Sequence, residues 1–459
     1  MKFVNKKLEE FNNYIKGKKV AIIGLGVSNI PLIDELYKLG ANITLFNNKD
    51  VENLDKTILD KIYEYKLKFF FGENYLNKLV GFDVIFRSPS CRPDTPQIEA
   101  EVKRGALLTS EIELVLEMCP GTTIGITGSD GKTTTTSLIY QILKEQGFNC
   151  YLGGNIGIPL FTKIKEMKPE DYVVLELSSF QLMTMKVSPQ IAVITNVTPN
   201  HLDIHKSYDE YKEAKANIFK MQNESDLLVL NYDNDITRNF AKEAKGNVVY
   251  FSSKEKLDNG IILDDGIIKD CENGLRRHIV NTKNIKLRGI HNAENICAAV
   301  AATKRFVSPE IQAKAVSEFS GVEHRLEFVK EVNNVKYYND TEATNIKCTQ
   351  IALSSFNEPT ILILGGYERG QDFNLLLPFT NNVKTIIAIG ETKDRVEDFA
   401  IKNNITCYKF ETLKESFTKI KEIIKPGDIV LLSPASASWD QYNRCEERGD
   451  EFKKYVNAL

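Results

Sequence analysis

The chain has 459 residues, a length that exceeds one ordinary hydrophobic core and suggests about three domains. Hydrophobic residues make up 42% and charged residues 26%, as in a folded soluble protein. The net charge of -3 favours neither nucleic acid nor a membrane surface as a partner, so we expect a small-molecule substrate. Eight scattered cysteines without metal-site spacing indicate reduced thiols, and the absence of a leader or a long apolar run predicts a cytoplasmic protein.

The first recognisable element is a β-α-β unit of Rossmann type near the start of the chain. A buried strand runs into the turn Gly24-x-Gly26-x-x-Asn29, and an amphipathic helix and a second strand follow. The third glycine of the usual fingerprint is missing, and the second strand ends in Asn47-Asn48 instead of the acid that binds a ribose in NAD enzymes. The pattern indicates some nucleotide diphosphate, and a tight turn without a ligand is the alternative.

A phosphate loop follows the next apolar strand, where residues 127–134 read T-G-S-D-G-K-T-T. Ile126 holds the place of the first glycine of the usual pattern, so the match is partial. Backbone N–H groups at the following helix N-terminus attract phosphate, Lys132 adds a charge, and the Thr133 hydroxyl can reach a magnesium ion. A strand-to-helix turn that binds nothing is the alternative. The residues expected to bind the nucleotide phosphates are Gly128, Ser129, Asp130, Gly131, Lys132, Thr133 and Thr134.

Polar residues follow the next two predicted strands. Glu176 ends one strand and could be a metal ligand, or it could cap a helix or pair with a lysine. His201 follows the other strand, at the sheet edge where ligands gather in open α/β folds. His201, Asp203 and His205 resemble a zinc cluster by composition, but alternate residues of an extended segment would need a bend to converge on one ion. A predicted helix then carries Lys215, a residue type that usually lies on the surface.

Beyond Gly321 the sequence changes to a new alternation of strands and helices. Strands at 360–364, 385–389 and 428–432 end in glycine or in Ser-Pro, and helical stretches separate them. The fold class is therefore α/β with three domains. These are an N-terminal Rossmann-like domain (1–110), a central P-loop-type mononucleotide-binding sheet (111–321) and a C-terminal Rossmann-like domain (322–459).

Nine motifs in one order resemble those of the Mur ligases, and within that family those of the enzymes that add D-glutamate. They are T-G-S-D-G-K-T-T (127–134), G-G-N-I-G (153–157), L-E-L-S-S-F-Q-L (175–182), N-V-T-P-N-H-L-D (196–203), Y-K-E-A-K (211–215), H-N-A-E-N (291–295), G-V-E-H-R (321–325), Y-N-D-T-E-A-T-N (338–345) and L-S-P-A-S-A-S-W-D (432–440). The resemblance spans nearly the whole chain.

The resemblance implies an ATP-dependent ligase of cytoplasmic peptidoglycan precursor synthesis, with two Mg2+ ions. D-Glutamate would be joined to UDP-N-acetylmuramoyl-L-alanine through an acyl phosphate. The first domain would hold the UDP-sugar, the second ATP, and the third would close on ATP and the amino acid. We expect a monomer with no nucleic-acid or membrane partner.

The resemblance also assigns residues to roles. Lys132, Glu176, His201 and Lys215 would be catalytic, with Lys215 carbamylated, and Thr133, Glu176, His201 and Lys215 would surround the metal ions. Adenine and ribose would lie against Asn292, Asn295, Arg325 and Asp340. The UDP-sugar substrate would contact Val27, Ser28, Asn47, Asn48 and Asn155, and the amino acid would contact Thr344, Arg369 and Ser438.

The acceptor site departs from the family pattern. Glu342 stands where the family usually has a lysine close to the D-glutamate carboxylate, and Cys445 replaces a residue that is often phenylalanine. A carboxylate at 342 would repel that substrate, so we expect Arg369 to bind D-glutamate and Glu342 to turn toward a Lys or Arg elsewhere. A pocket for a cationic or neutral amino acid is the rival.

Other classes of protein stay open from sequence. A nicotinamide oxidoreductase would explain the first glycine turn but leaves Lys132 without a role. A non-catalytic ATP-binding module would explain the phosphate loop but not Glu176, His201 and Lys215 together. Within the ligases, folylpolyglutamate synthases share the phosphate loop, and other Mur ligases add other amino acids.

Overall fold

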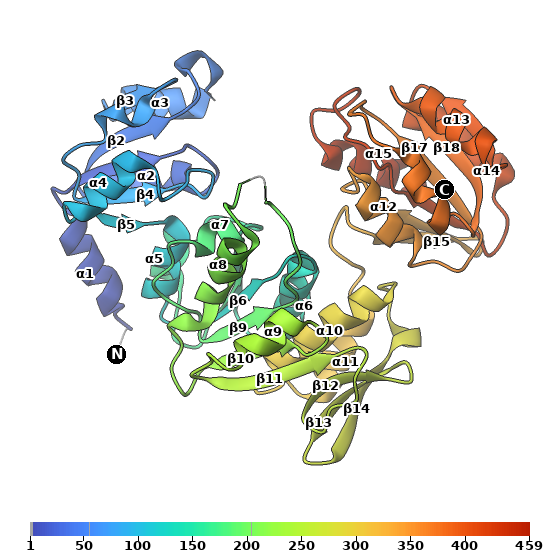
Figure 1. The fold of residues 1–459 in the computed structure, drawn as a ribbon, viewed down its shortest axis with the longest axis horizontal. Coiled ribbons are helices and arrows are strands. Elements are labelled where there is room, and N and C mark those ends of the chain that lie inside the picture. The colour runs from blue at the N-terminus through green and yellow to red at the C-terminus, as the bar shows by residue number, and fades with distance from the viewer. Residues whose placement is uncertain (1–2, 55, 203) are drawn as a thin grey trace. The chain divides into compact units, whose positions relative to one another are not determined.

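The computed structural model describes residues 3–54, 56–202 and 204–459. The chain divides into two compact units, one comprising the residues up to Ile279 with Glu294–Ala315, the other Val280–Ala293 with Val316–Leu459. Helices alternate with strands that form three sheets (Figure 1). The predicted α/β fold class is confirmed. The domain limits at 110 and 321 stay predictions.

The first sheet has the strand order β3-β2-β1-β4-β5, with all neighbours parallel. Its strands are β1 (Lys19–Ile23), β2 (Asn42–Asn47), β3 (Lys68–Phe71), β4 (Val84–Arg87) and β5 (Leu107–Thr109). The connecting helices are α1 (Lys6–Ile15), α2 (Asn29–Lys38), η1 (Val51–Asn53), α3 (Lys56–Glu64), η2 (Tyr75–Lys78) and α4 (Pro96–Lys103). Apolar side chains on both faces of β1 are fully buried, which is why this strand forms the middle of the sheet.

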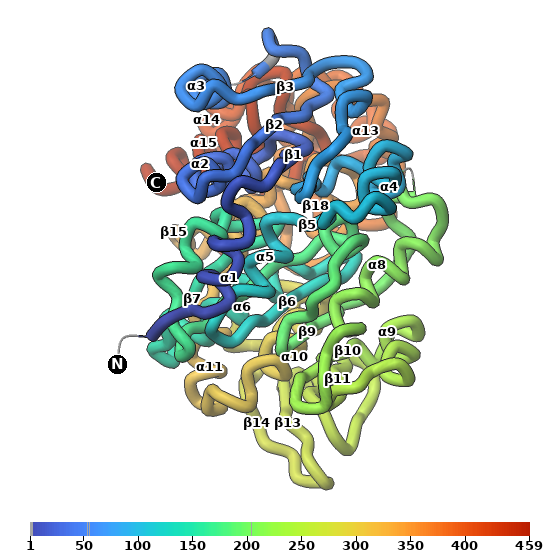
Figure 2. Tube along the Cα trace, turned by 90° about the vertical axis from the view of Figure 1, so that its left-hand side faces the viewer, coloured from blue at the N-terminus to red at the C-terminus, as the bar shows by residue number. Residues whose placement is uncertain are grey.

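The second sheet has the order β14-β13-β12-β11-β10-β9-β6-β8-β7. Its strands are β6 (Thr122–Thr127), β7 (Cys150–Gly154), β8 (Tyr172–Glu176), β9 (Ile191–Ile194), β10 (Leu227–Asn231), β11 (Asn247–Ser252), β12 (Gly260–Asp264), β13 (Ile267–Glu272) and β14 (Leu275–Asn281). Its helices are α5 (Glu111–Met118), α6 (Lys132–Glu145), η3 (Phe161–Glu166), α7 (Ser179–Leu182), α8 (Tyr208–Lys220), α9 (Asp235–Phe240), η4 (Thr282–Asn284), α10 (Ile290–Thr303) and α11 (Pro309–Glu318). Figure 2 shows the neighbouring strands β9, β10 and β11 side on.

The position of β6 in this sheet determines the surroundings of the phosphate loop. β6 lies between β8 and β9 and is parallel to both, with Ile126 opposite Glu176 and Thr127 opposite Ile194. The carboxyl ends of three strands therefore meet at one edge of the sheet. Ligands bind at such an edge in open α/β folds.

The third sheet, in the second unit, has the order β15-β16-β20-β17-β18-β19. Its strands are β15 (Glu327–Val332), β16 (Val335–Asn339), β17 (Thr360–Gly365), β18 (Val383–Ile389), β19 (Thr406–Phe410) and β20 (Ile429–Leu432), all parallel except β15. The helices are α12 (Ile346–Leu353), η5 (Phe373–Phe379), α13 (Lys393–Lys402), α14 (Leu413–Ile423) and α15 (Cys445–Asn457). This order brings the segments after β16, β17 and β20 to one edge.

The first two glycines of the motif at 153–157 end a strand, because Gly153 and Gly154 of β7 pair with Leu175 and Glu176 of β8. The strands β12 to β14 were not predicted. None of the helices in the described part of the chain has the length and apolar composition that a membrane span requires. None of the eight cysteines, all of which lie among the described residues, forms a disulfide.

Candidate active site

The phosphate loop joins the end of β6 to the start of α6. Gly128 has a φ of 154°, and a Cβ there would collide with the side chain of Thr195. Gly131 has a φ of 81° at the N-cap of α6, and a Cβ there would collide with Asn295. Glycine is required at both positions for this backbone path. The first N–H groups of α6 have no intrahelical acceptor, so the loop presents donors and the positive end of a helix dipole to an anion.

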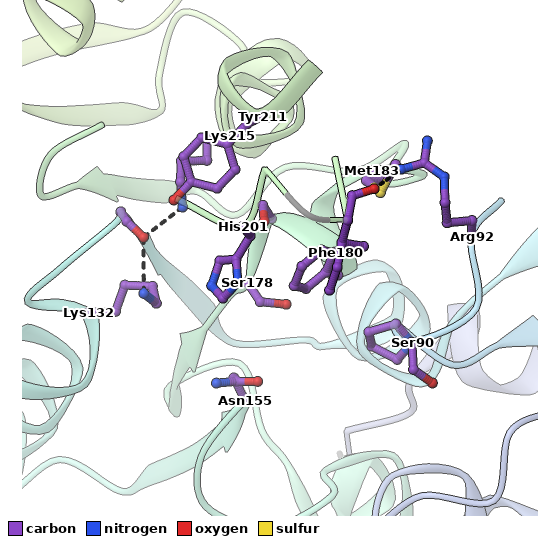
Figure 3. Close-up of a pocket in the computed structure, with 14 residues that line it drawn as sticks. Ser90, Arg92, Lys132, Asn155, Ser178, Phe180, Met183, His201, Tyr211 and Lys215 are labelled. Carbon is purple, nitrogen blue, oxygen red and sulfur yellow. Dashed lines mark hydrogen bonds between the residues drawn. The ribbon is translucent and has the colours of Figure 1, made fainter. Parts of the chain in front are cut away.

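Two lysines converge on one carbonyl oxygen of this loop. Lys132 Nζ donates to the Gly128 carbonyl at 3.0 Å and to the Ser129 carbonyl at 3.1 Å. Lys215 Nζ, from α8, donates to the same Gly128 carbonyl at 2.6 Å (Figure 3). This contact brings the basic ends of two lysine side chains close together beside the N-terminus of α6. The arrangement therefore fits an anion such as a phosphate chain.

Lys215 is a buried residue, with 1% of its surface exposed. Its Nζ lies 4.6 Å from the centre of the Tyr211 ring, and the Tyr211 hydroxyl shares a 2.9 Å hydrogen bond with Ser129. Burial, and then the charge of Lys132, lowers the pKa of Lys215 well below its ordinary value. The interpretation of Lys215 as an ordinary surface lysine is therefore wrong. An amine with a lowered pKa is available in its neutral, nucleophilic form.

Glu176 provides a carboxylate at the end of β8. Its Oε1 accepts a 2.9 Å hydrogen bond from Asn155 Nδ2, and its Oε2 is buried without a hydrogen-bond partner. A buried carboxylate oxygen with no donor is costly unless a cation joins it. The donor set therefore fits a magnesium ion, whose preferred ligands are oxygens. Thr133, in the first turn of α6, adds a hydroxyl.

His201 lies in the segment between β9 and α8. It is exposed, its φ is 53°, and its ring packs edge-on against Phe180 at 5.3 Å. His205, four residues later, is buried, and its Nε2 shares a 2.9 Å hydrogen bond with Ser179. Asp203 lies outside the described residues. Among the described residues, no cluster of three potential metal ligands includes His201 or His205, so nothing supports the zinc interpretation.

Arg92 fixes the segment that carries His201, a contact that the sequence does not reveal. Its guanidinium donates to the Ile204 carbonyl at 2.7 Å and pairs with Glu210 of α8 at 2.7 Å and with Asp94 at 2.8 Å. These partners are up to 118 residues away in sequence. The sequence analysis also assigned no role to Tyr211. Its position one turn before Lys215 on the same helix could have indicated that the two side chains lie together.

A pocket of about 410 Å³ in the first unit is lined by part of this set, without Thr133, Glu176 and His205 (Figure 3). Five residues with a predicted role line it: Gly128, Lys132, Asn155, His201 and Lys215. The other lining residues are Pro89, Ser90, Arg92, Ser178, Ser179, Phe180, Met183, Ile204 and Tyr211. The pocket therefore brings the phosphate loop together with the segments after β4, β8 and β9.

The predicted UDP-sugar residues lie at the carboxyl ends of β1 and β2. Val27 and Ser28 precede α2, and Asn47 and Asn48 end and follow β2. Asn29 stands where the third fingerprint glycine would be. Its buried amide donates to the carbonyls of Ile23 and Gly24 at 3.2 and 2.8 Å and so holds the turn. The side chain of Asn29 therefore stabilises this turn in the absence of the third glycine.

The predicted acceptor residues lie in the second unit. Ser438 Oγ, in the segment after β20, is buried without a hydrogen-bond partner. Arg369, in the segment after β17, is exposed, and its guanidinium lies 5.3 Å from the centre of the Trp439 ring. Thr344 is half-buried before α12. Glu342 forms an ion pair with Arg325, in agreement with the expectation that it turns toward a basic residue.

The predicted adenine and ribose residues are divided between the two units. Asn295 belongs to the first unit and contacts Thr135 and the position of Gly131. Asn292, Arg325 and Asp340 belong to the second unit. Asp340 is buried, which raises its pKa to about 7, although it accepts hydrogen bonds from Ser433 and from the Leu326 backbone.

The sequence matches two protein-family models and is similar to several known ligases over its full length. Residues 126–303 match the Mur ligase middle domain, and residues 324–436 match the Mur ligase glutamate ligase domain. The chain is 47% identical to the UDP-N-acetylmuramoylalanine--D-glutamate ligase of Acetivibrio thermocellus, covering 99% of this chain and 100% of that protein. It is 46% identical to the enzyme of the same name from Clostridium novyi, with the same coverage.

Solved structures share the fold at lower identity. The MurC ligase of Thermotoga maritima aligns with a TM-score of 0.57 at 18% identity, over 96% of this chain and 100% of that one. The MurF ligase of Thermotoga maritima, solved in complex with ADP, aligns with a TM-score of 0.55 at 20% identity, over 97% of each chain. The family follows from the sequence relatives: with 47% and 46% identity over 99% of its length to the two D-glutamate ligases above, the chain belongs to the Mur ligase family.

Proposed function

We propose that this chain is an ATP-dependent ligase that joins D-glutamate to UDP-N-acetylmuramoyl-L-alanine in peptidoglycan precursor synthesis. Full-length identity of 45% to 47% to proteins named for this activity supports the substrates. The observation that carries the chemistry is the convergence of Lys132 and Lys215 on the Gly128 carbonyl, together with the buried, partnerless oxygen of Glu176 at the end of β8. A nicotinamide oxidoreductase would leave this cluster without a role.

The reaction has two steps, and this chain's cations act in the first. A carboxylate oxygen of the muramoyl substrate attacks the γ-phosphorus of ATP, the bond to the β-phosphate oxygen breaks, and ADP leaves. Lys132 and the α6 N–H groups would hold the phosphates and balance their charge, which is the main requirement of phosphoryl transfer. The amine of D-glutamate then attacks the acyl phosphate carbon, phosphate leaves, and a proton is lost from nitrogen.

Magnesium in Mur ligases neutralises the phosphate oxygens. We assign Thr133 and Glu176 to one ion, with Asn155 orienting the Glu176 carboxylate, and His201 to a second ion. The exposed His201 ring lies in the pocket on a segment that Arg92 and His205 fix in place. The protein's contribution would be to hold these ligands before the nucleotide arrives.

Lys215 would carry a carbamate formed with carbon dioxide. Carbamylation needs a neutral amine, and burial beside Lys132 lowers the pKa of Lys215. The product is an anion, so it would attract the Lys132 ammonium and would supply an oxygen ligand to the second magnesium. In this step the lysine nitrogen bonds to the carbon of carbon dioxide, one C=O π bond opens to give a carboxylate oxygen, and the nitrogen loses a proton to solvent.

In the second unit, Arg369, Thr344 and Ser438 would hold the incoming amino acid. The partnerless hydroxyl of Ser438 could donate to a carboxylate, and Arg369 could bind a carboxylate through two parallel hydrogen bonds. Glu342 would not repel D-glutamate strongly, because Arg325 neutralises it. Asn292, Asn295, Arg325 and Asp340 would hold adenine and ribose. The domains 1–110, 111–321 and 322–459 would bind the UDP-sugar, ATP and the amino acid respectively, in a monomer.

The test is ADP release with ATP, Mg2+, UDP-N-acetylmuramoyl-L-alanine and a panel of D- and L-amino acids. We expect release with D-glutamate and little with D-lysine, D-glutamine or L-glutamate. Preference for D-lysine or a neutral amino acid would contradict the proposed acceptor. Release only with a folate substrate would contradict the muramoyl substrate. In Arg369→Ala, the apparent affinity for D-glutamate should fall.

A further inference from the structure

Trp439 is a large aromatic side chain that the fold leaves exposed, with 61% of its surface accessible. It follows Ser438 directly, so it stands beside the residue assigned to the amino acid. Its ring packs against Tyr367 at 5.7 Å between ring centres, and the Arg369 guanidinium lies 5.3 Å from its centre. The ring therefore faces solvent next to residues assigned to the amino acid.

The backbone that carries these side chains is held firmly. The Tyr367 N–H donates to the Ala437 carbonyl at 2.9 Å in an isolated antiparallel bridge, which ties the segment after β17 to the segment after β20. The Gln371 amide reinforces this link by donating to Ser436 Oγ at 2.5 Å and accepting from the Arg369 N–H at 2.9 Å. Hydrogen bonds therefore fix the backbone just before Trp439 and the backbone of Arg369.

The charges around Arg369 leave its guanidinium available. The neighbouring Glu368 could have captured it, but Glu368 is bound by Arg395 through two hydrogen bonds of 2.5 and 2.7 Å. In the part of the chain that the structure describes, no carboxylate lies within ion-pair distance of Arg369. The Trp439 ring is thus the partner that orients this cation.

We infer that Trp439 is a positioning residue that selects an acidic acceptor by holding Arg369 for its side-chain carboxylate. This inference rests on the proposed function and names a determinant of its amino-acid site. A guanidinium that stacks by its face on an aromatic ring keeps its N–H edge free for two parallel hydrogen bonds to a carboxylate. The stacked arginine also loses less rotamer freedom on binding, so D-glutamate binds more tightly. Because Glu342 stands where the family has a lysine, this chain depends more on Arg369.

The test compares steady-state ADP release in the full-length enzyme and in Trp439→Leu, Trp439→Phe and Tyr14→Leu. Leucine keeps an apolar side chain without a π-face, and we expect it to raise the KM for D-glutamate about threefold to fivefold. The kcat and the KM values for ATP and the UDP-sugar should stay unchanged. Phenylalanine should restore most of the affinity. Tyr14→Leu removes another exposed aromatic ring with a lysine 5.2 Å from its centre and should change nothing.

A second readout uses the fact that Trp439 is the single tryptophan of the chain. Its intrinsic fluorescence should change as D-glutamate is added in the presence of both nucleotides, and D-glutamine at equal concentration should not cause this change. Wild-type activity with D-glutamate, combined with an unchanged KM in Trp439→Leu and a constant emission, would overturn this inference alone. No ADP release from the wild type with D-glutamate would overturn the proposed function and this inference with it.

Discussion

Replacing Lys215 by methionine should separate stability from activity. Methionine is similar in length and shape but carries no charge. The variant loses the hydrogen bond from the neutral Lys215 amine to the Gly128 carbonyl, which contributes about 0.5 to 1.5 kcal/mol. It also removes the cost of burying a polar amine, which amounts to about 1 to 3 kcal/mol. The free energy of unfolding should therefore stay the same or rise by about 1 kcal/mol.

The activity of the same variant should collapse. If Lys215 supplies a preorganised anion after carbamylation, its loss should lower kcat by about 10² to 10³, or about 3 to 4 kcal/mol of transition-state stabilisation. The assay is ADP release with all three substrates, together with thermal unfolding of both proteins. Lys215→Ala leaves space in the pocket, so a short carboxylic acid added to the buffer should restore part of its activity. Lys215→Met, whose side chain fills that space, should not be rescued.

Two results would refute this reasoning. Full activity of Lys215→Arg would exclude the carbamate, because a guanidinium does not form one at neutral pH. A loss of thermal stability in Lys215→Met that matches its loss of activity would show that Lys215 stabilises the fold instead of acting in catalysis. Removal of carbon dioxide gives an independent measurement, since the wild-type rate should fall in degassed buffer and recover with bicarbonate.

Three further predictions concern other groups. Lys132→Ala should lower kcat by about 10² to 10³ in a folded protein, and a rate within about tenfold of the wild type would contradict its phosphate role. Chelation should abolish ADP release until Mg2+ is added back, and Glu176→Gln should need a higher Mg2+ concentration for half of its maximal rate. Burial raises the pKa of Glu111 to about 7, although the hydrogen bonds that its carboxylate accepts from the Leu160 and Phe161 backbone lower it. The stabilisation by protonated Glu111 is complete below its unfolded pKa near 4.5 and is lost as the pH rises through its folded pKa of about 7. The free energy of unfolding of the wild type should therefore fall by roughly 2 kcal/mol between about pH 5 and pH 8. Glu111→Gln should not show this loss. Equal pH dependence of thermal unfolding in both proteins would count against that pKa.

Local sequence patterns predicted the fold class and much of the candidate site. Apolar runs that end in glycine identified β1, β6 and β17, because a strand buried on both faces needs consecutive apolar residues and a tight exit. The phosphate loop was predictable for the same reason, since Gly128 and Gly131 adopt positive φ where a Cβ would collide with Thr195 and Asn295. These requirements act within a few residues, so they leave a local signature.

The contacts that hold the site together have no such signature. The pairing of Arg92 with Glu210 joins residues 118 positions apart, and nothing in either neighbourhood indicates the other. The burial of Lys215 depends on how α8 packs on the sheet, so a residue that is usually exposed became one of the least exposed charged groups. The amide of Asn29 replaces a fingerprint glycine, an exchange that only the hydrogen bonds reveal.

The ion pair between Arg325 and Glu342 explains how an acid is tolerated beside a site for D-glutamate, and it can be tested by a double-mutant cycle. The pair is partly exposed, with 54% and 28% of the two side chains accessible, so the pair itself stabilises the fold little. Its electrostatic effect on a substrate is larger, because an unpaired charge about 4 Å from a carboxylate costs about 1 kcal/mol even at the dielectric constant of water. Arg325→Ala should therefore raise the KM for D-glutamate at least about fivefold and should also raise the KM for ATP.

The double variant separates these two effects. Adding Glu342→Gln to Arg325→Ala removes the exposed acid, so the KM for D-glutamate should return to the wild-type value while the KM for ATP stays high. Glu342→Gln alone should change the KM for D-glutamate little, because Arg325 already neutralises the acid in the wild type. If the double variant bound D-glutamate as weakly as Arg325→Ala, the charge of Glu342 would not act on the acceptor. The acid would then be tolerated because it lies too far from the substrate, and Arg325 would have no part in the choice of amino acid.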